Sequence, residues 1–299
     1  MLVNKKAGSY SKRAVSDLIG AIKKAHASYT VYEPESAIDV LKQAEVASGK
    51  RRPSRKYPAP YAGSGPVTSM IACGGDGTFN LVGRAALKAK LPMGIIPLGK
   101  INNLARHYLG SAETGGAIKK IIAGAISQAD CAYASGLPFF GSIGMGFTPS
   151  LAEAIEADGL PRLALGWGRI GARTAADVPL KKTVIKVDSF RFEVRPIILN
   201  INVISFTAGL PISPASISDD GIAEILLDHE ANIGNFSRYT RLISRRKYLY
   251  GDDVRLYRGQ SIICQLVKGR TLYIDGELIE IPSDVLEVKI GSEKLSVFA

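Results

Sequence analysis

Apolar and polar positions follow two different patterns along the chain, and the first covers its N-terminal part. Short apolar runs at residues 1–3, 29–32, 70–73 and 93–97 predict strands. Apolar residues at helical spacing occupy the segments between these runs. Strands that alternate with helices predict a parallel sheet with right-handed crossovers. The helices are expected at residues 11–25, 36–47, 81–88, 104–109 and 114–124, and a further strand at 129–134.

After about residue 135, short strands separated by turn residues replace the helices. This second pattern predicts an antiparallel β-sandwich, interrupted by a helix near residues 150–157 and a basic helix at about 235–249. The expected fold class is α/β plus all-β, with an α/β domain at residues 1–131 and a β-sandwich domain at 132–299. The expected strands are 183–187, 190–194, 197–203, 222–227, 261–267, 271–274, 278–281, 286–290 and 295–298.

The composition agrees with two globular domains that bury a substantial core. The chain has 299 residues, of which 46% are hydrophobic and 22% charged. No apolar run approaches the roughly 18–20 residues that span a bilayer, and the N-terminus lacks the apolar core of a secretion signal. Cys73, Cys131 and Cys264 lie in apolar, strand-like settings without a CxxC pair. Disulfide and zinc interpretations are therefore disfavoured, and a cytoplasmic protein is expected.

The net charge of +11 favours polyanionic partners, namely nucleotides, nucleic acid or an anionic membrane surface. Nucleic acid is disfavoured because no RNP box, zinc finger or basic zipper region is present. Residues 49–66 combine basic residues with prolines and show no periodicity, which predicts an irregular, mobile loop. This loop could touch acidic lipid headgroups. A solvated basic insertion is the simpler alternative.

One glycine-rich turn carries the first chemical signal. Residues 74–80 read GGDGTFN between an apolar strand and a helix. Glycines let a ligand approach the backbone, and successive amides followed by a helix N-terminus form an anion site. Asp76 would repel a phosphate unless a metal or a transferable proton stood between them, which points to phosphoryl transfer. The alternative interpretation is a tight strand-to-helix turn, since Gly and Asp are common in turns.

A second polar turn follows the next strand. Residues 95–106 read IIPLGKINNLAR, with a helix expected after Asn102 or Asn103, either of which can cap it. In a parallel sheet the carboxyl ends of neighbouring strands meet at one edge, where ligands gather. Both turns are therefore expected at the same edge.

Two acidic turns lie in the second part of the chain, at residues 219–221 (Asp-Asp-Gly) and 275–277 (Asp-Gly-Glu). Each can be a simple turn, because Asp-Gly is a common hairpin pair. The additional carboxylates, Asp219 and Glu277, are not needed for a turn. Oxygen ligands of this kind suit magnesium, which binds few carboxylates together with water and substrate phosphates.

Four motifs together resemble the diacylglycerol kinase catalytic-domain family, which includes bacterial diacylglycerol kinases and sphingosine and ceramide kinases. The motifs are GGDGTFN, IIPLGKINNLAR, SISDDGIAEILL and YIDGELIEIP, in the order and rough spacing of that family and spread over nearly the whole chain. The resemblance implies an α/β nucleotide domain of the NAD kinase and phosphofructokinase type, a C-terminal β-sandwich, and ATP between them. It also implies Mg²⁺ and ATP as cofactors, and phosphoryl transfer to a lipid hydroxyl of a diacylglycerol-like or sphingoid substrate.

The resemblance also assigns residues. Asp275 and Glu277 would match an acidic pair credited with general-base work, with Asp76 near the metal and phosphates. Asp220 would match a metal carboxylate, helped by the carbonyls of Ile217 and Ile222, and Asp130 would match a carboxylate at the domain junction. The implied nucleotide-binding residues are Asn4, Gly74, Gly75, Asp76, Gly77, Thr78, Asn80, Gly99, Lys100 and Asn102.

The chain departs from the family at three positions on the nucleotide side. Lys100 stands where a threonine is usual, Lys5 replaces a proline, and Asn103 replaces an acidic residue. Lys100 could contact a phosphate as a point charge or fill the pocket. The alternatives to a lipid kinase are thus a catalytically weakened lipid-binding or regulatory protein and a soluble-substrate kinase of the NAD kinase type.

The expected partners are ATP and a lipid substrate at an anionic membrane surface, to which the cytoplasmic protein would bind peripherally. Nucleic acid is not expected, and a homodimer stays open.

Overall fold

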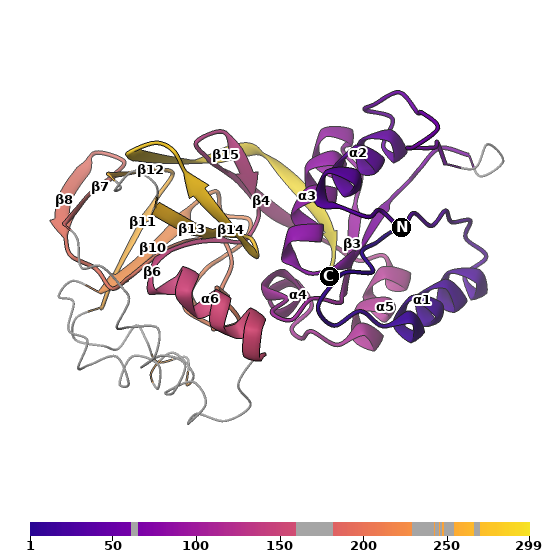
Figure 1. Cartoon of the computed structure of the whole chain (residues 1–299), viewed down its shortest axis with the longest axis horizontal. Helices are drawn as coiled ribbons and strands as arrows, with labels where there is room; N and C mark the ends of the chain where they lie inside the picture. The colour runs from indigo at the N-terminus through magenta and orange to yellow at the C-terminus, as the bar shows by residue number, and fades with distance from the viewer. Residues whose placement is uncertain are drawn as a thin grey trace. The chain divides into compact units, whose positions relative to one another are not determined.

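Two compact units make up the protein (Figure 1). The structure, a computed structural model, describes residues 1–60, 65–159, 182–228, 242, 245, 247, 254–265 and 270–299. The first unit comprises Met1–Ala129 together with Glu293–Ala299, and the second comprises Asp130–Ser292. The expected combination of an N-terminal α/β part and a C-terminal antiparallel β part is confirmed. The return of the last residues to the first unit has no counterpart in the sequence pattern.

The first unit is a parallel sheet with helices. Its strands are β1 (Leu2–Val3), β2 (Met70–Gly74), β3 (Met93–Pro97) and the end of β15 (Val285–Phe298), in that order across the sheet. Its helices are α1 (Lys12–Lys24), α2 (Ala37–Ala47), α3 (Asp76–Ala89), α4 (Asn103–Tyr108) and α5 (Thr114–Ala123).

Burial explains why β2 and β3 read as unbroken apolar runs. Both strands are buried along their whole length, and helices pack in pairs around them, α2 with α3 and α1 with α5 (Figure 1). Their parallel register runs from Met70 opposite Met93 to Gly74 opposite Pro97, and β1 lies parallel to β2 on its other side. The carboxyl ends of β1, β2 and β3 therefore emerge at the same edge of the sheet.

Local signals account for α1 and also for one wrong expectation. Ser11 caps α1 by accepting a hydrogen bond from the Ala14 N–H, and Leu18 and Ile22 are buried at helical spacing. The strand expected at residues 29–32 is absent, since the structure gives only one parallel bridge, from Tyr32 to Leu2. With β1 only two residues long, there is little strand for this segment to pair with.

The described residues of the second unit form two antiparallel sheets, accompanied by a helix. One sheet has the order β11-β10-β9-β6-β13-β14, and the other contains β15-β12-β7-β8, with β4 beside β15 and β5 beside β4. The helix is α6 (Phe147–Asp158). The strands are β4 (Ile126–Ala134), β5 (Leu137–Phe139), β6 (Ser142–Gly146), β7 (Thr183–Val187), β8 (Phe190–Val194), β9 (Ile198–Asn202), β10 (Ala223–Asp228), β11 (Val254–Gly259), β12 (Ser261–Gln265), β13 (Arg270–Ile274) and β14 (Glu277–Ile281).

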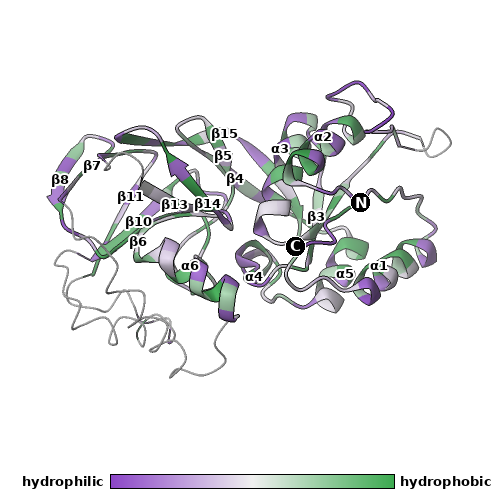
Figure 2. Ribbon diagram, in the orientation of Figure 1, coloured by the Kyte–Doolittle hydropathy of each residue, from purple (hydrophilic) through white to green (hydrophobic). Residues whose placement is uncertain are grey.

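A hydrophobic core lies between the two sheets, as a sandwich requires. Residues of β7, β12 and β15 in one sheet pack against residues of β6, β9, β10 and β13 in the other, and all are buried. The helix α6 packs on β6, β9 and β13, which helps to explain why β9 is buried along its whole length. Figure 2 shows hydrophilic residues interspersed along β8, which is largely exposed at the sheet edge.

Two strand expectations need correction. Residues 286–290 and 295–298 belong to one strand, β15, although Gly291 and Ser292 between them resemble a turn. A Cβ on Gly291 would lie 2.7 Å from Cε2 of Tyr133, so the glycine serves close packing against β4 and not a turn. The strand β11 was not expected at all. The basic helix expected at about 235–249 falls largely outside the described residues.

Candidate active site

The glycine-rich turn joins β2 to α3 as expected. Gly75 occupies the N-cap position of α3, and as a glycine it has no side chain that could cap the helix. A Cβ on Gly74 would lie 2.4 Å from Oγ1 of Thr78, which shows how closely that side chain folds back over the turn. Thr78 and Asn80 are buried within the first turns of α3, and Gly77 lies between them and the N-cap.

The second polar turn packs directly against the first. The Leu98 N–H donates to the Gly74 carbonyl at 2.8 Å, and a Cβ on Gly99 would lie only 2.6 Å from the Gly75 Cα. Asn102 has a φ of +57° and closes its own turn, because its Oδ1 accepts from the Gly99 N–H at 2.9 Å and its Nδ2 donates to the Gly99 carbonyl. The two turns expected at one edge are therefore in backbone contact.

Asp76 connects these two turns. Its Oδ2 accepts a hydrogen bond from the Asn103 N–H at 2.9 Å, and its Oδ1 accepts one from the Leu104 N–H at 3.0 Å. The side chain is buried, so the carboxylate caps α4 from a different segment of the chain. Asn102 occupies the N-cap of this helix, one of the two positions expected, but its side chain makes no capping hydrogen bond.

We expect Asp76→Ala to lower the free energy of unfolding by about 3 kcal/mol, because two buried N–H groups would lose a charged acceptor. Urea denaturation measures the change. Asp17→Ala on α1 is the matched control, since Asp17 is exposed and forms only a long surface ion pair, with Arg13 at 3.9 Å, within the described part of the chain. A loss from Asp76→Ala no larger than that of the control would contradict the capping role.

The loop after β1 completes this edge of the sheet. Asn4 donates from Nδ2 to Oγ1 of Thr78 at 3.0 Å, and its N–H donates to the Cys73 carbonyl at 2.9 Å. The stem of Lys100 lies over Gly8, where an added Cβ would meet Cγ of Lys100 at 2.7 Å. Three loops thus converge where β1, β2 and β3 end, and Lys100 packs along the first of them.

His107 on α4 makes the folding stability of the protein depend on pH. Burial lowers the pKa of His107 from 6.5 to about 4. The pKa of His107 is lower in the folded protein than in the unfolded chain, so between pH 6.5 and about 4 the unfolded chain binds more protons. The stability that the neutral His107 contributes above pH 6.5 is therefore lost progressively as the pH falls towards 4. We expect a loss of about 1–2 kcal/mol, since the imidazole keeps partial solvent contact.

Urea unfolding at neutral and acidic pH measures this dependence in the native protein and in His107→Gln. The variant should lose stability less steeply below pH 6.5. His26→Asn is the matched control, because His26 is exposed and asparagine tolerates its φ of +54°. Equal acid sensitivity in His107→Gln and the native protein would contradict the prediction.

In the second unit, the turn between β13 and β14 has the hairpin geometry that its Asp-Gly pair predicts. Asp275 and Gly276 both have positive φ, +45° and +90°. The Asp275 carboxylate is buried and accepts from the Phe140 N–H at 2.7 Å and the Ser142 N–H at 3.0 Å. Glu277, the first residue of β14, is exposed. The two carboxylates of the motif therefore have different surroundings.

The other acidic turn is held by protein groups. Asp220 accepts from the Ile222 N–H at 3.0 Å through Oδ1 and from Arg258 through Oδ2. Asp130 is buried and accepts from the Gly221 N–H at 2.8 Å. Ile217 has an exposed side chain in the same loop. Oδ2 of Asp220 is held by the positively charged guanidinium of Arg258 and Oδ1 by the Ile222 N–H, so this turn does not fit the magnesium ion implied by the resemblance.

Sequence reasoning missed two residues at this turn. Arg258 lies on β11, a strand that the pattern did not reveal, and Glu224 is buried on β10, within an otherwise apolar run. The sequence offered one signal, the presence of Glu224 inside the apolar run of a predicted strand. A charged residue at such a position is rarely buried without a partner.

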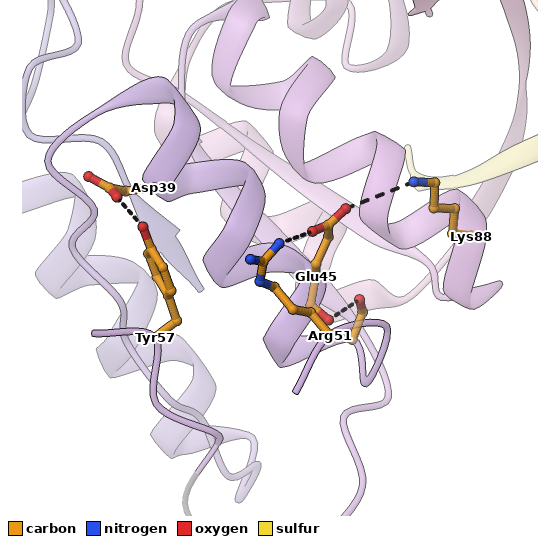
Figure 3. A network of polar contacts seen from close by, with 6 residues as sticks. Asp39, Glu45, Arg51, Tyr57 and Lys88 are labelled. Carbon is orange, nitrogen blue, oxygen red and sulfur yellow. Dashed lines mark hydrogen bonds and ion pairs between the residues drawn. The ribbon is translucent and has the colours of Figure 1, made fainter. Parts of the chain in front are cut away.

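The described part of the basic loop contacts α2 through several side chains. Figure 3 shows the Tyr57 hydroxyl directed at Asp39, and Arg51 and Lys88 on either side of Glu45. Tyr57 donates to Asp39 at 2.6 Å, and Arg51 lies 3.5 Å from Glu45. Lys56 also pairs with Asp39 at 2.9 Å, and hydrogen bonds from Ser36, Tyr57 and Lys56 hold the pKa of Asp39 well below its usual range. The described residues of the loop, 49–60 and 65–66, contain no helix or strand, as expected, and these contacts join residues 51–57 to α2.

Comparisons with known proteins agree with the motifs. A family model described as Diacylglycerol kinase catalytic domain matches residues 1–134. A diacylglycerol kinase of Staphylococcus saprophyticus is 24% identical over 93% of this chain and 88% of its own length, and one of Bacillus subtilis is 23% identical over 70% of each. A crystal structure from Bacillus anthracis str. Sterne, described provisionally as a diacylglycerol kinase, superposes with a TM-score of 0.75 at 19% identity, covering 99% of this chain and 95% of that one. None of the described helices is long and apolar enough to cross a membrane.

Proposed function

The chain belongs to the diacylglycerol kinase catalytic-domain family, and from this premise we propose that it is an ATP-dependent kinase that phosphorylates a lipid hydroxyl. One observation in the first unit supports the nucleotide part of the proposal. The turns after β2 and β3 touch through Gly75 and Gly99, beside a helix N-terminus without a side-chain cap. Close backbone approach and helix amides suit the phosphates of a nucleotide.

Phosphoryl transfer requires the protein mainly to position the two substrates and to neutralise phosphate charge. The oxygen of the lipid hydroxyl attacks the γ-phosphorus, the bond from that phosphorus to the bridging oxygen breaks, and ADP leaves. Magnesium enters with ATP as part of the substrate and neutralises phosphate charge. In this proposal the amides of residues 75–78 hold the phosphates, and Asp76 positions the second turn by capping α4. A carboxylate of the second unit accepts the hydroxyl proton.

Glu277 is the better candidate for that proton acceptor. Asp275 is buried and its two oxygens already accept backbone hydrogen bonds, which suits a structural role. Glu277 is exposed on the same hairpin and can meet a substrate. We therefore propose Glu277 as general base and Asp275 as the residue that positions the hairpin.

Radiolabelled ATP and a panel of lipids, including diacylglycerol and sphingoid bases in anionic and zwitterionic vesicles, test the function. We expect label transfer to at least one lipid, faster on anionic vesicles and slowed by salt, because the protein carries a net charge of +11. No labelled lipid across the panel would contradict the kinase proposal. Transfer of equal rate on both vesicle types would contradict peripheral binding to anionic membrane.

The effect of Lys100 on ATP binding distinguishes the kinase proposal from the alternative, a catalytically weakened lipid-binding or regulatory protein. Its stem packs over Gly8, in the loop that also carries Asn4. Calorimetric titration with ATP and magnesium compares the native protein with Lys100→Thr, which restores the residue usual in the family. Weaker binding by the variant supports a phosphate contact from Lys100. Absent binding by the native protein, recovered in the variant, supports the weakened alternative.

A further inference from the structure

Arg258 lies between two carboxylates in the second unit. It stands directly opposite Glu224 in the antiparallel pairing of β10 with β11. Its Nε lies 3.3 Å from Oε1 of Glu224, and its Nη2 donates to Oδ2 of Asp220. One guanidinium therefore joins the end of the acidic turn to the strand that follows it. Opposite charges at directly paired positions stabilise a sheet.

The carboxylate of Glu224 is buried, so the charge of Arg258 beside it matters for stability. The Glu224 side chain is 1% exposed and that of Asp220 is 21% exposed, whereas Arg258 keeps 46% of its side chain exposed. A buried carboxylate needs a compensating cation, and a guanidinium presents several donors at once. Arg258 supplies that compensation.

Two carboxylate oxygens at the turn accept hydrogen bonds from protein amides. Asp220 Oδ1 accepts from the Ile222 N–H, and Asp130 Oδ2 accepts from the Gly221 N–H. The Asp130 N–H in turn donates to the Ser218 carbonyl at 2.6 Å. A magnesium ion would need oxygen ligands in near-octahedral geometry at about 2.0–2.1 Å, and the Asp220 oxygens face N–H donors instead.

We propose that Arg258 takes the place of the metal ion that the resemblance implies at this turn, so that residues 216–224 keep their fold without a divalent metal. The resemblance implies a metal carboxylate at Asp220, and the Arg258–Asp220–Glu224 cluster is this chain's replacement for that site. The inference concerns stability of the nucleotide-free protein. It is therefore independent of whether the protein is a kinase.

Thermal unfolding of the whole, nucleotide-free protein tests the proposal. The native protein should melt at the same temperature in a chelator and in excess magnesium chloride. Arg258→Met should lower the melting temperature by about 5–10 °C, because Glu224 is left buried without its counter-charge. In that variant, added magnesium or manganese should restore part of the loss through the two carboxylates.

Arg255→Met is the matched control, since Arg255 is exposed on the same strand and donates to the Val254 carbonyl. If Arg258→Met does not fold, Arg258→Lys serves instead, because an ammonium cannot bridge two carboxylates as a guanidinium does. Adding Glu224→Gln to the Arg258 variant should recover stability. A native melting temperature that rises with magnesium, or an Arg258 variant as stable as Arg255→Met, would overturn the proposal.

Discussion

Gly99→Ala is expected to weaken ATP binding by at least about 100-fold, and phosphoryl transfer with it. The added Cβ would lie 2.6 Å from the Gly75 Cα and 2.8 Å from Oδ1 of Asn102. The first neighbour is backbone, so the clash cannot be relieved by turning a side chain. The turns after β2 and β3 must separate, and the amides of the glycine-rich turn lose their alignment. Calorimetric titration with ATP and magnesium measures the loss.

A graded series makes this prediction specific. Gly75→Ala should weaken ATP binding less, because its Cβ would lie 3.2 Å from the Gly99 Cα, a contact that a small shift can relieve. Gly116→Ala in α5 is the control, as nothing lies within 4 Å of its added Cβ, and alanine favours a helix. Circular dichroism and urea unfolding establish that each variant is folded. Native affinity in folded Gly99→Ala would show that the nucleotide does not depend on this contact.

Glu277→Gln is expected to lower kcat by about 100- to 10,000-fold, the usual range for loss of a general base. Because Glu277 is exposed, its substitution should change the free energy of unfolding by less than about 0.5 kcal/mol. The acidic limb of the pH–rate profile should also disappear, since the group that must be deprotonated is gone. Steady-state kinetics over a pH series, with ATP saturating, measures both effects.

Asp275→Ala should show the opposite balance. It removes the acceptor of the Phe140 and Ser142 N–H groups, so we expect a loss of about 3 kcal/mol in unfolding free energy. Asp275→Asn, which keeps one acceptor oxygen, should be milder in stability and retain the pH–rate limb. If folded Asp275→Asn lost that limb and Glu277→Gln kept it, the roles of the two carboxylates would be reversed.

The sheet edge could be predicted from sequence because it follows from local patterns. Apolar runs that end in glycine-rich or asparagine-rich turns mark buried parallel strands, and parallel strands share a carboxyl edge. The partners of Asp76 could not be predicted in the same way. Its two N–H donors lie 27 and 28 residues later in the chain, and only the register of β2 with β3 brings them close.

The second unit shows a related limit. The Gly-Ser pair at 291–292 has the composition of a turn, yet Gly291 is needed for close packing beside Tyr133. Arg258 gave no recognisable signal, since its role depends on pairing with Glu224 across a ladder whose strand β11 was not identified. Residue type can suggest a metal carboxylate at Asp220, but a competing guanidinium is visible only when the tertiary contacts are known.

The return of the chain to its first unit bears on biosynthesis. Val297 pairs with Met93, and the Ala299 N–H donates to the Ala125 carbonyl, so β3 gains its neighbour from residues translated after the whole second unit. During elongation on the ribosome, the nascent first unit would carry an uncovered strand edge, the kind of surface that recruits other chains. Chaperone protection is therefore most valuable before residues 293–299 leave the exit tunnel, and an excised fragment of residues 1–129 would keep that exposed edge permanently.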